Sequence, residues 1–575
     1  MFKLKKYLAN YKKESIIGPL FKLLEACFEL LVPLVMAKIV DVGIRNADVP
    51  YIMKMCAVMV AFGVFGLASA LTAQYFAAKA ATGFGTALRE DLFRHINRFS
   101  YTELDTIGTS TLVTRITSDI NQAQAGVNLL LRLFLRSPFI VAGAVILAFT
   151  VNVHLAWIFV VLVPLLSIVI YGIMMLTIPI YKKVQNHLDV VLRLTRESLA
   201  GARVVRAFSR QGDEIRAFNE ESTLLMNTQL FVGKISALLN PVTYIIINAA
   251  TIMVLWLGGK TVYLGELTQG ELIALINYMS QILLALVALA NLIISATKAS
   301  ASAARINDVF ARTSDMKEGG QTAPQKKDAY KVCFDHADFA YKGNKNALTD
   351  IHMEVKPGQT IGIIGGTGAG KSSVVNLIPR FYDASAGNVL VDGMDVKEYT
   401  FAALRGKVGV VPQNAVLFAG TIRENMKWGK RDATDEEIYR ALETAQAKEF
   451  VDAKPEGLDT QILQGGKNFS GGQRQRLTIA RALVGEPEIL ILDDSASALD
   501  FATDAKLRRA IASRTGGMTV FIVSQRASSI KNADQILVLD DGRQVGLGTH
   551  EELIENCGIY REICLSQLSE EEMHR

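Results

Sequence analysis

Six long apolar stretches in the first half of this 575-residue chain restrict its fold more than any other feature. Each is close to the roughly 20 residues that an α-helix needs to cross the hydrocarbon core of a bilayer. One such stretch could be a buried helix of a soluble protein, but six of this length argue against that alternative. The predicted membrane-spanning helices lie at residues 16–40, 55–77, 129–150, 155–179, 235–257 and 272–297.

Basic residues gather in the N-terminal segment and in the two long connections, residues 79–128 and 181–234. The positive-inside tendency therefore predicts that all three face the cytosol, and six crossings then leave both termini there. The N-terminal segment lacks the layout of a cleavable signal and suits a short amphipathic helix on the membrane surface. The two connections have helical composition, so we expect cytosolic extensions of the second to fifth helices, each pair joined by a short helix.

Several polar residues lie within these stretches, and ionisable groups inside a membrane are costly. One interpretation is that they line a substrate path, and the other is that they form helix–helix hydrogen bonds. The residues are Glu25 and Glu29 in the first stretch, Asn248 in the fifth, and Asn277, Gln281 and Asn291 in the sixth.

The second half of the chain has a different composition. Short β-branched runs alternate with amphipathic stretches from residue 330 onward, which is typical of an α/β domain. A polar segment rich in glycine and lysine separates the halves. The predicted organisation is a membrane domain at 1–311, a linker at 312–329 and an α/β domain at 330–575. The net charge of +5 is too small and dispersed to indicate nucleic acid, and the five scattered cysteines have no metal-binding spacing.

A glycine-dense turn between a predicted strand and a predicted helix fits G-x-x-x-x-G-K-[ST] in full. Backbone N–H groups in such a loop curl around phosphate oxygens, the lysine reaches the β- and γ-phosphates, and the serine hydroxyl binds Mg²⁺. This phosphate-binding loop comprises Gly365, Gly366, Thr367, Gly368, Ala369, Gly370, Lys371, Ser372 and Ser373.

Two further segments suit nucleotide chemistry. Residues 489–492 form an apolar strand that delivers Asp493 where a carboxylate holds Mg²⁺ beside the loop, the Walker B arrangement. A predicted helix start offers a second phosphate-binding surface, because a serine caps it and glycines expose its first N–H groups. That surface is Ser470, Gly471, Gly472 and Gln473. One chain cannot easily place both surfaces on the same nucleotide, so a sandwich between two domains is expected.

These motifs, in this order, resemble those of the ATP-binding cassette (ABC) transporter family. Residues 469–473 resemble its LSGGQ signature, Tyr341 matches the aromatic residue that stacks on adenine, and Gln413 matches the Q-loop. Residues 497–500 are similar to the D-loop, and residues 548–553 to the end of the nucleotide domain. Residues 108–115 and 201–208 look like coupling-helix regions. The resemblance implies a type IV exporter half-transporter that binds ATP and Mg²⁺, with Ser372, Gln413 and Asp493 as metal ligands.

Three positions depart from the family pattern. Asp494 stands where active members have a glutamate that polarises the attacking water, and Gln525 stands where they have a switch histidine. Gln464 replaces a glutamate that often couples the two halves. The predicted catalytic group, comprising Asp494, Gln525 and Gln413, is therefore degenerate. It indicates the impaired half of a heterodimeric exporter, whose partner carries Glu and His at the two positions.

The resulting hypothesis is an ATP-hydrolysing translocase that exports hydrophobic or amphipathic small molecules, drug- or lipid-like, across a bacterial plasma (inner) membrane. The nucleotide domain and both termini are expected in the cytosol. A peptidase-like segment ahead of the membrane part is lacking, which disfavours leader-peptide export. Two alternatives remain at this stage, a homodimeric exporter with a slow site and an ATP-gated regulatory or channel protein.

Overall fold

The computed structural model describes residues 2–324, 330–342, 346–495, 498–514 and 517–568. The chain divides into two compact units. We call residues 1–97 and 110–312 the helical unit, and residues 98–109 and 313–575 the sheet unit. The short segment 98–109 lies within the first half of the sequence but folds with the second half.

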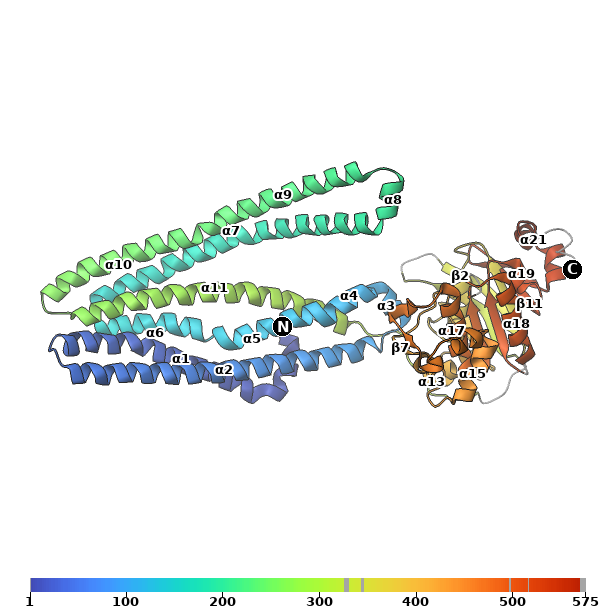
Figure 1. Ribbon diagram of the computed structural model, residues 1–575, viewed down its shortest axis with the longest axis horizontal. Helices are drawn as coiled ribbons and strands as arrows, with labels where there is room; N and C mark the ends of the chain where they lie inside the picture. Colours follow the sequence, from blue (N-terminus) through green and yellow to red (C-terminus); the bar gives the residue numbers. More distant parts are fainter. Residues whose placement is uncertain (1, 325–329, 343–345, 496–497, 515–516, 569–575) are drawn as a thin grey trace. The chain divides into compact units, whose positions relative to one another are not determined.

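The helical unit consists of long helices that run side by side over much of their length (Figure 1). Its elements are η1 (Phe2–Tyr11), α1 (Lys12–Lys38), η2 (Ile39–Ile44), α2 (Val49–Ile96), α4 (Thr109–Thr114), η3 (Arg115–Asp119), α5 (Ile120–Leu133), α6 (Arg136–Val151), α7 (Val153–Ala200), α8 (Ala202–Ala207), α9 (Gln211–Ala237), α10 (Leu239–Tyr263) and α11 (Gln269–Ala311). Its interior is apolar, with Phe159, Leu166 and Tyr278 fully buried.

Five helical segments within the described residues are long and apolar enough to cross a membrane. They are Val49–Ile96, Thr109–Val151, Val153–Ala200, Gln211–Tyr263 and Gln269–Ala311. They confirm five of the six predicted crossings by length and composition. α1 covers the remaining stretch and has 27 residues, but it carries charged side chains along its length. A sixth crossing therefore stays a prediction.

The charged residues in the middle of α1 have partners inside the helical unit. Lys22 pairs with Glu25 at 2.5 Å, and Arg136 at the start of α6 pairs with Glu29 at 2.6 Å. The amide nitrogen of Gln281 on α11 donates to the Glu29 carbonyl oxygen at 3.2 Å. Of the two interpretations of these polar residues, the contacts favour helix–helix interaction for Glu29 and Gln281.

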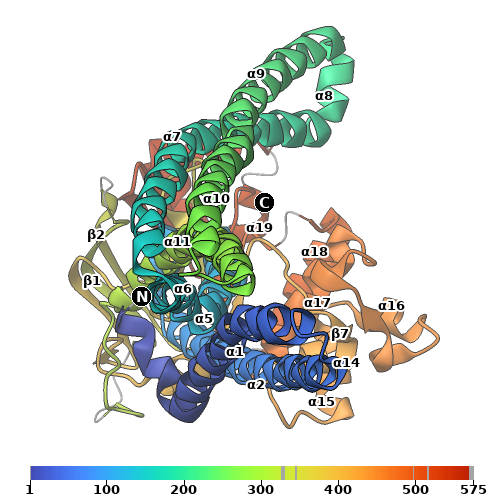
Figure 2. The same cartoon turned by 90° about the vertical axis from the view of Figure 1, so that its left-hand side faces the viewer.

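α8 joins the far ends of α7 and α9, which stand away from the other helices of the unit (Figures 1 and 2). It is the short helix expected at residues 201–208, and none of its residues is buried. The first short helix is displaced from its predicted place. It is α3 (Tyr101–Ile107), and residues 108–115 begin the next long helix instead. Ser100 and Glu103 form a capping box at its start, and Gly108, with φ 79°, ends it.

The sheet unit is built on a ten-stranded sheet in the order β5-β4-β1-β2-β12-β11-β3-β10-β9-β6, with helices packed against it. The strands are β1 (Val332–Ala340), β2 (Asn346–Val355), β3 (Thr360–Gly365), β4 (Ala386–Val391), β5 (Met394–Asp395), β6 (Val408–Val411), β9 (Ile489–Asp493), β10 (Thr519–Val523), β11 (Gln535–Asp540) and β12 (Arg543–Gly548). β11, β3, β10, β9 and β6 run parallel, as expected for an α/β domain, whereas β1, β2, β4 and β5 pair antiparallel.

One apolar cluster against the sheet includes the buried Phe334 and Phe521, and a second includes the buried Leu490 and Val520. The helices of this unit, besides α3, are α12 (Lys371–Leu377), α13 (Phe401–Gly406), α14 (Ile422–Met426), α15 (Asp435–Thr444), α16 (Lys448–Asp452), η4 (Gly457–Asp459), η5 (Gln464–Gly466), α17 (Gly471–Val484), α18 (Phe501–Arg514), α19 (Ala527–Ile530), α20 (His550–Asn556) and α21 (Gly558–Leu565). A small two-stranded sheet pairs β7 (Gly420–Thr421) with β8 (Gln461–Ile462).

α3 packs against the rest of the sheet unit through two aromatic residues that follow α12. The ring of Tyr101 lies 4.6 Å from that of Phe381, and the Tyr382 hydroxyl donates to the Asp105 carboxylate at 2.6 Å. The segment after α11 is also held there, because the N–H of Gly319 donates to the Tyr399 carbonyl oxygen at 3.1 Å.

Candidate nucleotide site

The glycine-dense loop lies between β3 and α12, at the carboxyl end of a buried parallel strand. Three of its glycines are required by their surroundings or by their backbone conformation. A Cβ on Gly365 would approach the Leu539 carbonyl oxygen of β11 to 2.2 Å, and Gly368 and Gly370 have φ values of 85° and 92°. A Cβ on Gly366 or Gly368 would meet no described atom within 4 Å, so the loop faces open space. Its backbone therefore forms a cradle that an anionic group can approach closely.

Lys371 begins α12 and its ammonium group folds back over the loop. Its Nζ donates to the Gly365 carbonyl oxygen at 2.9 Å and to that of Gly366 at 2.7 Å. Burial lowers the pKa of Lys371, while the charges of Asp494 and Asp493 oppose that shift. A cation that is poorly hydrated and held by neutral carbonyl groups is well suited to a phosphate.

Ser372 and Asp493 meet at the floor of the site. The Ser372 hydroxyl donates to the Asp493 carboxylate at 2.9 Å. Burial at the end of β9 raises the pKa of Asp493, and the hydrogen bond from Ser372 opposes that shift. A hydroxyl and a carboxylate are hard oxygen donors, which Mg²⁺ prefers, and its charge would offset the cost of keeping Asp493 ionised there. The residues present therefore fit this metal ion.

One carboxylate oxygen of Asp494 accepts hydrogen bonds from two side-chain amides. The amide nitrogen of Gln413 lies 3.3 Å from its Oδ2, and that of Gln525 lies 3.4 Å from the same atom. The backbone of Asp494 has a φ of 44°, and its N–H donates to the Val523 carbonyl oxygen at 3.0 Å. The structure therefore brings together the three side chains that the sequence assigns to the catalytic group.

A cavity of about 440 Å³ joins these groups. It is lined by Tyr341, Ala347, Thr367, Gly368, Ala369, Gly370, Lys371, Ser372, Ser373, Gln413, Asp493, Asp494, Val523 and Gln525. The Tyr341 hydroxyl lies 3.1 Å from the Ser373 hydroxyl, and its ring packs edge-on against Phe339 and Tyr382. Sequence reasoning missed Ala347 and Val523, which carry no motif of their own.

The second predicted phosphate surface lies elsewhere on the sheet unit. Ser470 caps α17 in a capping box with Gln473, and Gly471 and Gly472 follow the cap. None of these residues lines the cavity around Lys371 within the part of the chain that the structure describes. A Cβ on Gly472 would approach the Ala498 carbonyl oxygen to 3.1 Å, which favours glycine there. Ser497 of the predicted D-loop lies outside the described residues.

The fold and the site define a multi-pass membrane protein that carries a P-loop nucleotide-binding domain. A family model described as the ABC transporter transmembrane region matches residues 15–286, and one described as ABC transporter matches residues 348–497. The chain belongs to the ABC transporter family.

Similar proteins match over most of their length. An uncharacterised ABC transporter ATP-binding protein of Mycobacterium tuberculosis is 38% identical, covering 98% of this chain and 97% of that protein. The ATP-dependent lipid A-core flippase of Desulfotalea psychrophila is 33% identical, covering 82% of each chain. A solved structure of a bacterial Atm1-family ABC exporter with ATP bound has a TM-score of 0.79 at 24% identity, covering 97% of this chain and 99% of that one. The last match shows that the chain has the exporter fold.

Proposed function

We propose that this chain is one half of a heterodimeric ATP-driven exporter and that its own ATP site hydrolyses slowly. The observation that carries the proposal is the surroundings of Asp494. One oxygen of its carboxylate already faces the amide nitrogens of Gln413 and Gln525. The rest of the site retains the groups that hold a nucleotide. The chain would therefore bind ATP but hydrolyse it slowly.

A general base must accept a proton from the attacking water at hydrogen-bond distance. The amide nitrogens of Gln413 and Gln525 compete with water for the Asp494 oxygen that would accept the proton. Gln525 itself has no titratable group that could take part in proton transfer. Aspartate is also one methylene shorter than glutamate, which withdraws the carboxylate by about 1.5 Å. A well-placed base contributes about 10²- to 10⁴-fold to a rate, and that is the factor this site forfeits.

The binding groups have separate tasks. Lys371 would move from the loop carbonyls to the phosphates, and the loop N–H groups would hold the phosphate oxygens. Ser372, Asp493 and Gln413 would hold Mg²⁺, which when bound neutralises charge on the β- and γ-phosphates. Tyr341, at the edge of the cavity, would stack on the adenine.

A second half-transporter chain would complete both ATP sites. Ser470, Gly471, Gly472 and Gln473 are exposed or half-buried away from this chain's own cavity, where they can contact a nucleotide on a partner. Such a partner would carry Glu and His at the catalytic positions. Exposed side chains of α8 and of the residue that follows it, Val204 at 60% and Phe208 at 74% exposure, suit a surface that a second chain covers.

The helical unit would carry the transport pathway. α1 would make the sixth crossing, because Lys22 compensates Glu25 and Arg136 compensates Glu29. The proposed domains are 1–311, 312–329 and 330–575, with both termini and the nucleotide domain in the cytosol of a bacterial cell. A hydrophobic or amphipathic small molecule is the proposed cargo, which agrees with the flippase named among the relatives.

The test is the Mg²⁺-ATPase rate of the purified full chain in lipid vesicles. We expect a rate near background for the chain alone and at least a tenfold gain for Asp494→Glu combined with Gln525→His, within the 10²- to 10⁴-fold that a base can supply. Adding Lys371→Ala to that pair should abolish the gain, which locates it at this site. Asp540→Glu, at the end of β11, is the matched control for an added methylene.

Robust ATPase from the unaltered chain would refute the impaired site and favour a homodimeric exporter. Nucleotide-dependent ion conductance without movement of an amphipathic probe lipid would favour a channel.

A further inference from the structure

An irregularity in the pairing of β1 with β2 brings three metal-ligating side chains together. Phe334 pairs with Met353 and Ala337 pairs with Ile351, so two residues of β1 face one residue of β2. The two are Asp335 and His336, and the one is His352. This two-against-one arrangement is a β-bulge, a feature that redirects side chains and often adjoins functional sites.

The bulge exposes two consecutive side chains of one strand. In a regular strand, neighbours point to opposite faces, but Asp335 and His336 are both exposed, as is His352. His336 has a φ of 45°, which is uncommon outside glycine. On the other side of β1, a Cβ on Gly387 of β4 would lie 2.1 Å from the His336 carbonyl oxygen, so the neighbouring strand is shaped to accept the bulge.

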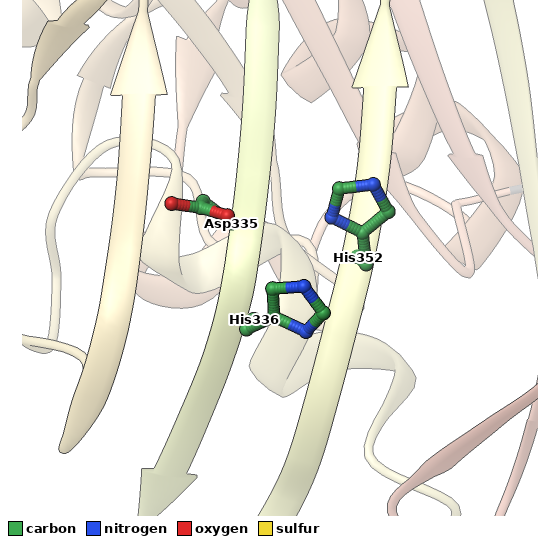
Figure 3. Close-up of side chains that lie close together, drawn as sticks. All are labelled: Asp335, His336 and His352. Carbon is green, nitrogen blue, oxygen red and sulfur yellow. The ribbon is translucent and has the colours of Figure 1, made fainter.

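Figure 3 shows the three side chains gathered on two adjacent strands. One ligand atom from each can be chosen so that all three lie within 4.8 Å of one another. The two imidazole rings stack with centroids 4.9 Å apart. Ligand atoms at about 2.0–2.1 Å from a tetrahedral ion lie about 3.3 Å from one another. A modest rotation of these exposed side chains would bring their ligand atoms to that spacing.

A fourth residue orients one of the ligands. Asp350 of β2 lies 2.5 Å from His336 through a carboxylate oxygen and Nδ1. When Nδ1 donates its hydrogen to that carboxylate, Nε2 carries the lone pair that binds a metal. Asp350 is itself held, since its N–H donates to the Asp338 carboxylate at 2.7 Å. A metal-binding histidine is usually held in place by a carboxylate that accepts from its other ring nitrogen.

We propose that Asp335, His336 and His352 form a binding site for a divalent first-row transition metal ion such as Zn²⁺. Two imidazoles and one carboxylate suit such an ion and disfavour Mg²⁺. The site is therefore chemically distinct from the oxygen-donor set of Ser372 and Asp493. Three protein ligands leave coordination positions open to water, and the bound ion ties β1 to β2 in the strand that leads to Tyr341.

The experiment measures Zn²⁺ binding by titration calorimetry to the full chain in detergent, carrying no histidine tag and kept in excess Mg²⁺. We expect one Zn²⁺ per chain. Asp350→Asn keeps all three ligands and removes only the orienting carboxylate, so it should weaken binding by about 10- to 100-fold. His352→Gln and Asp335→Asn each remove a ligand, and each should abolish the binding of one Zn²⁺ per chain.

The control is His187→Gln, which removes a histidine that also pairs with a carboxylate, Glu221 at 2.5 Å. Among the described residues, no third metal-ligating side chain joins that pair, so this variant should bind Zn²⁺ as the parent does. Unchanged thermal unfolding of the metal-free variants verifies that they fold. Binding that survives both His352→Gln and Asp335→Asn, or that is lost equally in His187→Gln, would overturn the assignment.

Discussion

The contact that holds α3 on the sheet unit can be tested by removing one oxygen atom. The Tyr382 hydroxyl donates to the Asp105 carboxylate at 2.6 Å, and Tyr382→Phe deletes that donor while keeping the ring. The Tyr101–Phe381 ring contact remains. We therefore expect α3 to stay docked in the variant but to open more often.

The size of the effect follows from the charge of the acceptor. A hydrogen bond to a charged group contributes about 1.5–3 kcal/mol, which is roughly a 10- to 150-fold change in the opening equilibrium. Burial, and then the hydrogen bond to Asp105, raise the pKa of Tyr382 well above its usual range. Because the docked pKa is raised, the contribution is fully present at neutral pH and is lost only as pH rises past about 10, the usual tyrosine value.

Hydrogen exchange on the full chain measures this equilibrium directly. The amides to follow are those of Leu104 and Gly108, which donate within and at the end of α3. Their protection should fall by roughly 10- to 150-fold in Tyr382→Phe, equally at pH 6 and pH 8 after correction for intrinsic rates. Tyr278→Phe is the control, since it deletes a buried hydroxyl donor to the Leu30 carbonyl oxygen in the helical unit. Equal protection of α3 in the two variants would refute the reasoning.

Two further predictions concern the sheet unit. Lys371→Ala should weaken equilibrium binding of a fluorescent ATP analogue by about 10- to 150-fold, the loss of one charged hydrogen bond, and an unchanged Kd would contradict the assigned role. Asp392 accepts from Lys331 at 2.7 Å and from Lys407 at 2.5 Å, and the substitution Asp392→Asn should cost about 1.5–3 kcal/mol of stability at pH 7, because both lysines keep Glu488 as a partner. Although burial opposes it, the two lysines hold the pKa of Asp392 below its usual value, so its contribution is present above about pH 4 and lost below. The melting temperature of the parent should therefore fall more steeply than that of Asp392→Asn between pH 5 and pH 3.

The local motifs could be predicted from sequence because short-range geometry determines them. The loop from Gly365 to Ser372 needs only a strand, glycines and a helix in succession, and the structure has these in that order. The start of α3 was also readable, because Ser100 and Glu103 have the spacing of a capping box. The first short helix, expected at 108–115, lies one element earlier, because Gly108 has the positive φ of a helix end and closes α3.

The remaining features depend on long-range pairing. The bulge at Asp335 and His336 arises from the register of β1 against β2 and β4, and no local pattern specifies it. The partner of Glu29 is Arg136, 107 residues away. A single sequence shows that such charges exist but not which of them meet.

That distance has a consequence for how the chain is made. A charged residue near the middle of a helix adds roughly 2.5–3.5 kcal/mol to the cost of insertion by the translocon. For the proposed sixth crossing, Glu29 receives its counter-ion only when α6 has been synthesised, long after α1 leaves the ribosome. α1 is therefore expected to wait at the translocon or the membrane surface, and its entry into the bilayer becomes a late, assembly-dependent step of biogenesis.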